Sequence, residues 1–304
     1  MSFNEGTRLD PNRVQRRGAG GAKGGMAVGG GIGALLIGLV LAILTGNMDF
    51  LTSGLDSTVQ GGGAGAVEDA TAQKDYNERC ATPQAAEEYA DCRVLPVIES
   101  LDAYWTDALP AAGFRHVLPG VVVFDQATPS ACGTATSATG PFYCPPDQKL
   151  YVDTTFFDSL TQFGYENGNL AEAYVIAHEY GHHIENELGI FDIADRSGSG
   201  ANSDSVKVEL MADCLAGVWV GHAATTPDPD TGVPFLKPVT QEQLDNALAA
   251  AASVGDDRIQ ETIQGEADPH TFTHGTSEER TEAFVAGYSN GTVASCDTFG
   301  VLGR

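Results

Sequence analysis

One short run, residues 178–182 (HEYGH), constrains this chain more than any other. Its two histidines, His178 and His182, are four residues apart, so on a helix their imidazoles lie on one face and can reach a single metal ion. Glu179 projects beside that face, where a carboxylate can accept a proton from a water that the metal activates. The spacing therefore predicts a hydrolytic zinc site on a helix.

The surrounding sequence predicts that this helix covers residues 169–188. The segment is rich in Ala, Leu, Glu and Ile and contains no proline, and Gly189 is placed to end the helix. Asn169 followed by Glu172 has capping-box spacing. Gly181 costs about 1 kcal/mol against alanine inside a helix. A glycine there indicates that another backbone element approaches closely, as a substrate strand would.

A catalytic zinc site needs a third protein ligand and keeps a fourth position for water. The best candidates lie in residues 205–220 (SVKVELMADCLAGVWV), where Glu209 and Asp213 share a helix face. We expect Glu209 to bind the metal and Asp213 to accept the far N–H of a ligating histidine. The reverse assignment stays open, as does a buried acid satisfied by a salt bridge. His222 and His270 are weaker candidates for the ligand.

Hydrolysis also needs a group that stabilises negative charge on the carbonyl oxygen, and a neighbouring His or Tyr commonly assists the metal. His274 precedes a predicted helix start, which the spacing of Thr276 and Glu279 marks as a capping box. We expect His274 to face the cleft as a catalytic residue, although it could equally cap a turn in the core. Tyr143 and His222 are weaker candidates.

An uncharged run of 21 residues, 26–46, predicts a transmembrane helix. As a helix it spans about 31 Å, against a hydrocarbon core of about 30 Å. Basic side chains outnumber acidic ones in residues 1–25, so the positive-inside rule predicts a cytoplasmic N-terminus and an extracytoplasmic remainder. A cleaved signal peptide is the alternative, but its charged region would be unusually long.

The rest of the chain divides into a flexible Gly-rich linker, expected over 47–75, and one domain over 76–304. Residues 121–124 and 149–153 have the pattern of strands. A strand at the edge of a sheet can pair with an extended substrate backbone. Either 149–153 or 134–143 could form that edge, and ordinary core strands are an equal alternative.

The formal net charge of −25 favours solubility and argues against nucleic acid as a partner. All six cysteines follow the apolar run, and an even number there predicts disulfides and an oxidising compartment. Metal binding by cysteine is disfavoured because no CxxC pair occurs. The sequence does not choose among the possible pairings. We favour two local bonds and one that ties the C-terminus to the core, namely Cys80–Cys92, Cys132–Cys144 and Cys214–Cys296.

Several blocks of sequence resemble, in order, the bacterial membrane-anchored predicted neutral zinc metallopeptidases. The blocks are FNEGTRLDPNRVQRRG, the Gly-rich apolar run, GPFYCPPDQKLYVDTTFF, HEYGHHIE, VELMADCLAGVW, GDDRIQ and FTHGTSEER. The resemblance covers nearly the full length. It implies an α+β, zincin-like metallopeptidase domain with an active-site HExxH helix and a small mixed sheet, preceded by one N-terminal transmembrane helix.

The same resemblance implies Zn²⁺ as the cofactor, with His178 and His182 as ligands and Glu179 as the catalytic base. The pattern of Glu209 and Asp213 is similar to the second helix of thermolysin-type zincins, where the first acid binds zinc and the last orients a histidine. The gap before Glu209 is somewhat longer than in that group, and its polar residues are expected to form a loop.

The expected function is therefore zinc-dependent hydrolysis of peptide bonds, with Glu179 as general base for the attacking water. The expected partners are peptide or protein substrates, with those of the cell envelope as one candidate source, and the membrane, through a single helix. Two alternatives stay open. One is a catalytically silent, zinc-containing envelope protein that binds partners, and the other is a zinc amidase acting on cell-wall peptides.

Overall fold

The computed structural model describes residues 1–18, 64–137, 139–160 and 169–302. Helices in this part of the chain are α3 (Ala64–Arg79), α4 (Pro83–Glu88), α5 (Ala90–Ala111), α6 (Thr155–Leu160), α7 (Asn169–Glu187), α8 (Ile190–Ile193), α9 (Asp204–Ala223), α10 (Gln241–Ser253), α11 (Asp256–Gln264) and α12 (Ser277–Asn290). Short 3-10 turns lie at η1 (Pro11–Arg13), η3 (Pro269–Thr271) and η4 (Val293–Cys296). The strands are β1 (Gln15–Arg17), β2 (Gly120–Phe124), β3 (Ala127–Ser130), β4 (Gly133–Thr136), β5 (Phe142–Cys144) and β6 (Lys149–Asp153).

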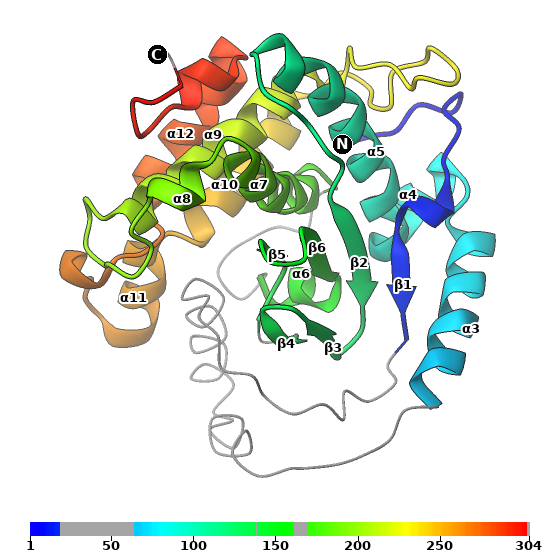
Figure 1. The fold of residues 1–304 in the computed structure, drawn as a ribbon, viewed down its shortest axis with the longest axis horizontal. Coiled ribbons are helices and arrows are strands. Elements are labelled where there is room, and N and C mark those ends of the chain that lie inside the picture. The colour runs from blue at the N-terminus through cyan, green and yellow to red at the C-terminus, as the bar shows by residue number, and fades with distance from the viewer. Residues whose placement is uncertain (19–63, 138, 161–168, 303–304) are drawn as a thin grey trace.

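A small mixed sheet lies beside a group of packed helices, which confirms the α+β class (Figure 1). Its strand order is β1-β2-β6-β5, with β1, β2 and β6 parallel and β5 antiparallel to β6. Strands β3 and β4 form a separate hairpin. Of the two segments considered for a substrate-facing edge, 149–153 is interior because β6 pairs on both sides. Strand β5, which begins at the end of segment 134–143, is an edge strand of the sheet.

Helix α7 forms as the sequence predicts, and it packs closely against α9. A Cβ atom built on Gly181 would lie only 3.0 Å from the Cα of Ala212. The expected close approach is therefore present, but the partner is a second helix rather than a substrate strand. Because a side chain at residue 181 would push α9 away, Gly181 sets the distance between the two helices that hold the predicted metal ligands.

Helix α12 approaches the other side of α9 just as closely. A Cβ on Gly287 would fall 1.9 Å from the carbonyl oxygen of Cys214, so only glycine fits at this crossing. The Cys214–Cys296 disulfide lies next to it and joins α9 to η4. The other two predicted bonds, Cys80–Cys92 and Cys132–Cys144, are also present, so the favoured pairing is confirmed.

The N-terminal part of the chain departs from the predicted division into tail, linker and domain. Residues 1–17 pack against the domain and supply β1. Within the linker expected over 47–75, α3 begins at Ala64, and the side chain of Gln73 bonds the backbone of β1. A helix therefore replaces the end of the expected linker; four of its sixteen residues are Ala, which favours a helix once the segment can pack.

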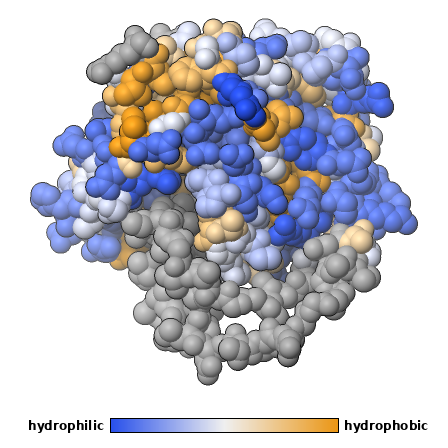
Figure 2. Space-filling model, viewed as in Figure 1, coloured by the Kyte–Doolittle hydropathy of each residue, from blue (hydrophilic) through white to orange (hydrophobic). Residues whose placement is uncertain are grey.

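The transmembrane helix predicted over 26–46 lies outside the described residues. Among the residues that are described, no helix is both long and apolar enough to cross a membrane. The face seen in Figure 2 is largely hydrophilic, in keeping with the strong net charge, and its hydrophobic areas lie mainly toward the top of the view.

Candidate metal centre

The crossing of α7 and α9 brings the three predicted ligands together. Nε2 of His178 lies 3.1 Å from one carboxylate oxygen of Glu209, and Nε2 of His182 lies 3.7 Å from the other. Around a tetrahedral zinc ion with bonds of about 2.0–2.1 Å, neighbouring ligand atoms are about 3.3 Å apart. The three ligand atoms form one group, all within 4.8 Å of one another. The group therefore has the size that zinc requires.

The far nitrogen of each histidine is held by a carboxylate. Nδ1 of His178 lies 2.8 Å from Asp213, and Nδ1 of His182 lies 2.7 Å from Glu185. Such partners fix the tautomer and leave Nε2 free to bind a metal. The structure thus places Asp213 behind His178, and Glu209 rather than Asp213 in the ligand group. Glu185 was missed, although its spacing of three residues from His182 on one helix was a readable signal.

Two further side chains hold Asp213 itself. Nε of Arg280, from α12, donates to Asp213 at 2.8 Å, and the hydroxyl of Tyr174 donates to the same carboxylate. All three side chains are buried. Nothing in the sequence identified Arg280, because its partner is 67 residues away. The position of His178 is therefore fixed by contacts from three helices.

The charges of this group fit a cation at its centre. Burial opposes a charge on His178, but Asp213 and then Glu209 raise its pKa to about 10, so a metal that binds its Nε2 would displace a proton from this imidazole. Burial likewise opposes a charged Glu209, but His274, His182 and His178 hold its pKa well below its usual range. Burial lowers the pKa of His182 to about 3, so this imidazole is neutral, as a metal ligand must be. Two imidazoles and one carboxylate are the donor set of many catalytic zinc sites.

Glu179 follows His178 on α7 and contacts the edge strand β5. Its carboxylate accepts a hydrogen bond of 2.8 Å from the backbone N–H of Tyr143 in the edge strand β5. Burial, and to a smaller extent Glu209, raise the pKa of Glu179 to about 7, against the lowering effect of His178 and of the Tyr143 N–H. A carboxylate with a pKa near neutrality suits proton transfer at physiological pH.

His274 lies on the turn before α12, where the Thr276–Glu279 capping box is present as predicted. Its Nδ1 lies 3.3 Å from Asp256, and Asp256 also accepts the backbone N–H of His274 at 2.6 Å. Burial opposes a charge on His274, but Glu209 and then Asp256 raise its pKa. The imidazole therefore lies within electrostatic reach of the ligand group. Asp256, the second residue of the GDDRIQ block, was not predicted.

The weaker candidates have other partners. The Tyr143 hydroxyl bonds Nδ1 of His183 at 3.0 Å, so it points away from the ligand group. His222 bonds the carbonyl oxygen of Val218 and stacks on Tyr104. His270 is exposed in η3. In the described part of the chain, none of these side chains joins the group of His178, His182 and Glu209.

A second cluster of possible ligands consists of His183 and Glu187 on α7 and of His116. Nδ1 of His116 is 2.6 Å from Glu187, which is a hydrogen-bond distance and shorter than the about 3.3 Å between two ligands of one zinc ion. His183 is already bonded through both nitrogens, to Tyr143 and to the carbonyl oxygen of Val117. This cluster is a hydrogen-bond network that supports the helix.

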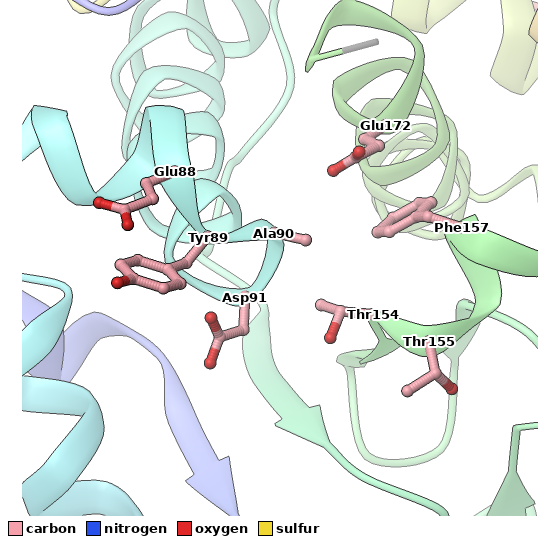
Figure 3. Close-up of a pocket in the computed structure, with 8 residues that line it drawn as sticks. All are labelled: Glu88, Tyr89, Ala90, Asp91, Thr154, Thr155, Phe157 and Glu172. Carbon is pink, nitrogen blue, oxygen red and sulfur yellow. The ribbon is translucent and has the colours of Figure 1, made fainter. Parts of the chain in front are cut away.

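A separate pocket lies where α4, α5, α6 and α7 meet (Figure 3). It is lined by Glu88, Tyr89, Ala90, Asp91, Thr154, Thr155, Phe157 and Glu172. None of these residues belongs to the ligand group, so the pocket is distinct from the metal centre.

Comparison with known proteins agrees with this geometry. A family model described as "Putative neutral zinc metallopeptidase" matches residues 2–299. The uncharacterized protein Rv2575 of Mycobacterium tuberculosis is 45% identical over 222 residues, covering 73% of this chain and 74% of that protein. The uncharacterized protein YpfJ of Escherichia coli K12 is 37% identical over 209 residues, covering 67% and 69%. No solved structure was found to match the chain. The chain belongs to the neutral zinc metallopeptidase family that this description names.

Proposed function

We propose that this protein is a zinc-dependent peptidase, with His178, His182 and Glu209 as ligands. The observation that carries the proposal is the arrangement of the two imidazoles, each with Nε2 turned toward Glu209 and Nδ1 fixed by a carboxylate. When bound there, Zn²⁺ would act as a Lewis acid that activates water and polarises the substrate carbonyl.

Glu179 is the proposed general base. The Tyr143 N–H fixes one oxygen of its carboxylate, and the near-neutral pKa lets the group both accept and release a proton. In the proposed reaction Glu179 takes the proton from the attacking water and delivers it to the leaving amine.

His274 is the proposed donor to the carbonyl oxygen on which charge develops. Asp256 holds its Nδ1, which leaves Nε2 as the donor that can face the substrate. A raised pKa favours the protonated, donating form of His274. Preorganised donors of this kind stabilise the transition state because they need no reorganisation during the reaction.

The free edge of β5 is the proposed binding site for the substrate backbone. Strand β5 pairs with β6 on one side, and Tyr143 on this strand bonds the catalytic Glu179. An extended peptide added to this edge would bring its carbonyl close to the base. Backbone pairing gives affinity without demanding a particular side-chain sequence. The proposed substrates are accordingly peptides or unfolded protein segments. The proposed location is extracytoplasmic, at the cell membrane, and the three disulfides support the extracytoplasmic part of this proposal.

The test is cleavage of a mixed peptide library by the zinc-loaded full-length protein, read by mass spectrometry. Its control is the Glu179→Gln variant, which keeps the shape and all three ligands. We expect products from the natural protein and a turnover about 10²- to 10⁴-fold lower for the variant. Zinc content is measured in both, so that loss of metal is not mistaken for loss of the base.

Purified cell-wall fragments form a second arm of the same assay. Release of amide-linked peptides from these fragments alone would favour the amidase. No products from any substrate, with zinc bound in both proteins, would contradict the proposal and favour a silent zinc-containing protein.

A further inference from the structure

The first 17 residues form an arm that is built into the domain. We call residues 1–17 the N-terminal arm; in Figure 1 it runs in dark blue along the sheet and past α5. Met1, Phe3, Leu9 and Val14 are buried, between 0% and 8% exposed. A tail in free solution would not place four apolar side chains out of water, and each such burial is worth about 1.5–3 kcal/mol for a large apolar residue.

Backbone pairing fixes the arm at both ends. Strand β1 extends the sheet by pairing parallel to β2, with Gln15 opposite Val122 and Arg17 opposite Phe124. Near the start, Phe3 forms an antiparallel bridge with Leu236. The Asn4 N–H donates to the carbonyl oxygen of residue 235 at 3.0 Å beside this bridge. These contacts join the arm to parts of the chain more than 100 and more than 200 residues away.

The basic residues of the arm have acidic partners in the domain. Arg13 makes a two-pronged contact with Asp102, at 2.5 and 3.0 Å. Arg16 pairs with Asp125 at 2.5 Å and lies 3.9 Å from Asp91, the carboxylate that also lines the pocket in Figure 3.

Arg8 and Arg17 also contact the domain, but among the described residues only Arg8 has acidic partners. Arg8 lies 3.7 Å from Asp230, and its backbone N–H donates to Asp228 at 2.8 Å. Arg17 donates to the hydroxyl of Thr128 and to the carbonyl oxygen of Pro129. Arg8, Arg13 and Arg16 of the arm therefore each lie next to an acidic residue of the domain.

These four arginines are four of the five basic residues from which the positive-inside rule predicts a cytoplasmic N-terminus. That rule treats basic residues as free charges next to a membrane span. A single crossing by the run at 26–46 would place the arm and the domain on opposite sides of the membrane. Such an arrangement and the docked arm exclude each other in one folded molecule.

We propose that the N-terminal arm is a structural part of the metal-site domain and lies on the same side of the membrane as the metal site. The arm also supports the active helix, because Asp102, which binds Arg13, accepts a hydrogen bond of 2.9 Å from Tyr180. Tyr180 stands between the two histidine ligands on α7. Separating the arm from the domain would leave Asp102 without its cation and α7 without one of its supports.

The test is a zero-length cross-link in the full-length protein, in membranes of cells that produce it. Arg8→Lys places an amine near Asp230, at a site where the two side chains are 79% and 66% exposed, so the fold is not disturbed. A carbodiimide then condenses a neighbouring amine and carboxylate into an amide with loss of water. Peptide mass spectrometry identifies the bond between residue 8 and residue 230 or 228.

The chain contains a matched internal control. Lys74 and Glu78 on α3 are also 3.7 Å apart and are 74% and 69% exposed. Their cross-link reports that the reagent reaches the domain. The Arg8→Gln variant, which has no amine, identifies background products.

We expect both cross-links in the Arg8→Lys protein and only the Lys74–Glu78 product in Arg8→Gln. A Lys74–Glu78 product without the residue 8 product would overturn the proposal and favour an arm on the opposite side. The readout does not involve activity, so it stands apart from the test of peptidase function.

Discussion

The metal centre and the N-terminal arm both contain buried charges, but the charges are balanced differently. At the metal centre the acids Glu179, Glu185, Glu209 and Asp213 face Arg280 as the one permanently cationic side chain bonded to this group in the described structure. In the arm, each ion-paired arginine meets its own acid. Four acids beside two imidazoles and one bonded arginine indicate a place for a cation, whereas matched pairs of arginine and acid indicate a structural role. Changes at the metal centre should therefore affect zinc and turnover, and changes in the arm should affect stability.

The largest expected effect is loss of metal from the Glu209→Ala variant. Because this change removes one of three ligands, zinc affinity should fall by more than about 100-fold, beyond the 10- to 100-fold loss typical of an outer partner. Zinc content is measured by atomic absorption after dialysis, and circular dichroism checks the fold. Glu278→Ala, in an exposed position at the start of α12, is the control and should keep its zinc. A zinc content in Glu209→Ala equal to that of the natural protein would contradict the assignment of Glu209 as a ligand.

A smaller loss of zinc affinity is expected for Asp213→Asn. The variant keeps the shape of the side chain but removes the negative charge that His178 and Arg280 share, and zinc affinity should fall about 10- to 100-fold. Competition with a chelator of known affinity measures the zinc affinity. The matched variant Asp256→Asn weakens the other carboxylate–histidine pair, at His274. It should lower kcat and leave zinc affinity unchanged. Equal zinc loss in both variants would contradict the assignment of His178 as a zinc ligand and of His274 as a hydrogen-bond donor that does not bind zinc.

For the arm, Arg13→Ala should destabilise the fold without removing a ligand. The pair with Asp102 is largely but not fully buried, at 17% and 12% side-chain exposure. The free energy of unfolding should fall by about 1–2 kcal/mol, which corresponds to about 5 °C in Tm. This is less than the about 3–5 kcal/mol lost when a fully buried pair is broken. Thermal unfolding of the full-length protein measures this loss of stability. Arg8→Ala, at an exposed ion pair, is the control and should cost about 0–1 kcal/mol. An unchanged Tm in Arg13→Ala would show that the arm adds little to the fold.

The smallest expected effect is a pH dependence at Glu99, which lies under the arm. Burial, and then Asp102, raise the pKa of Glu99 from 4.5 to about 8, against the lowering effect of the Asp10 N–H. The folded state therefore binds this proton more tightly than the unfolded state, and stability falls as pH rises from 4.5 to about 8. Glu99→Gln removes this loss.

The Tm of Glu99→Gln should exceed that of the natural protein at about pH 8.5 by about 2–4 °C, the shift that about 1 kcal/mol produces. At about pH 4 the two proteins should unfold at nearly the same temperature, because Glu99 is then protonated in both states. A gain that is equal at both pH values would mean that the effect is not linked to this proton.

Much of the metal centre could be predicted because its residues follow helical spacing. His178 and His182 are four apart on α7, and Glu209 and Asp213 are four apart on α9. Their partners outside these helices could not be predicted, since Arg280 and Asp256 come from segments brought in only by the packing of α12 and α11. Glu185 was accessible from its spacing and was overlooked.

The fold shows the same division. Helix α7, strands β2 and β6 and the three disulfides match the predictions. Which strand forms the edge could not be read from the sequence, because an edge is a property of the whole sheet. The end of the linker was misjudged because α3 gains its stability from packing on β1, and isolated helices of this length are marginal in water.

By itself, the sequence determined the chemistry of the site: two imidazoles, a base and two acids on helix faces, with a donor set suited to zinc. Local periodicity is sufficient for this, because residues four apart on one helix must share a face. Only the tertiary structure decided which acid meets which histidine, and where the arginines of the arm find their partners. Those pairings join residues up to more than 200 positions apart, and the close contacts at Gly181 and Gly287 that create them depend on how whole helices pack.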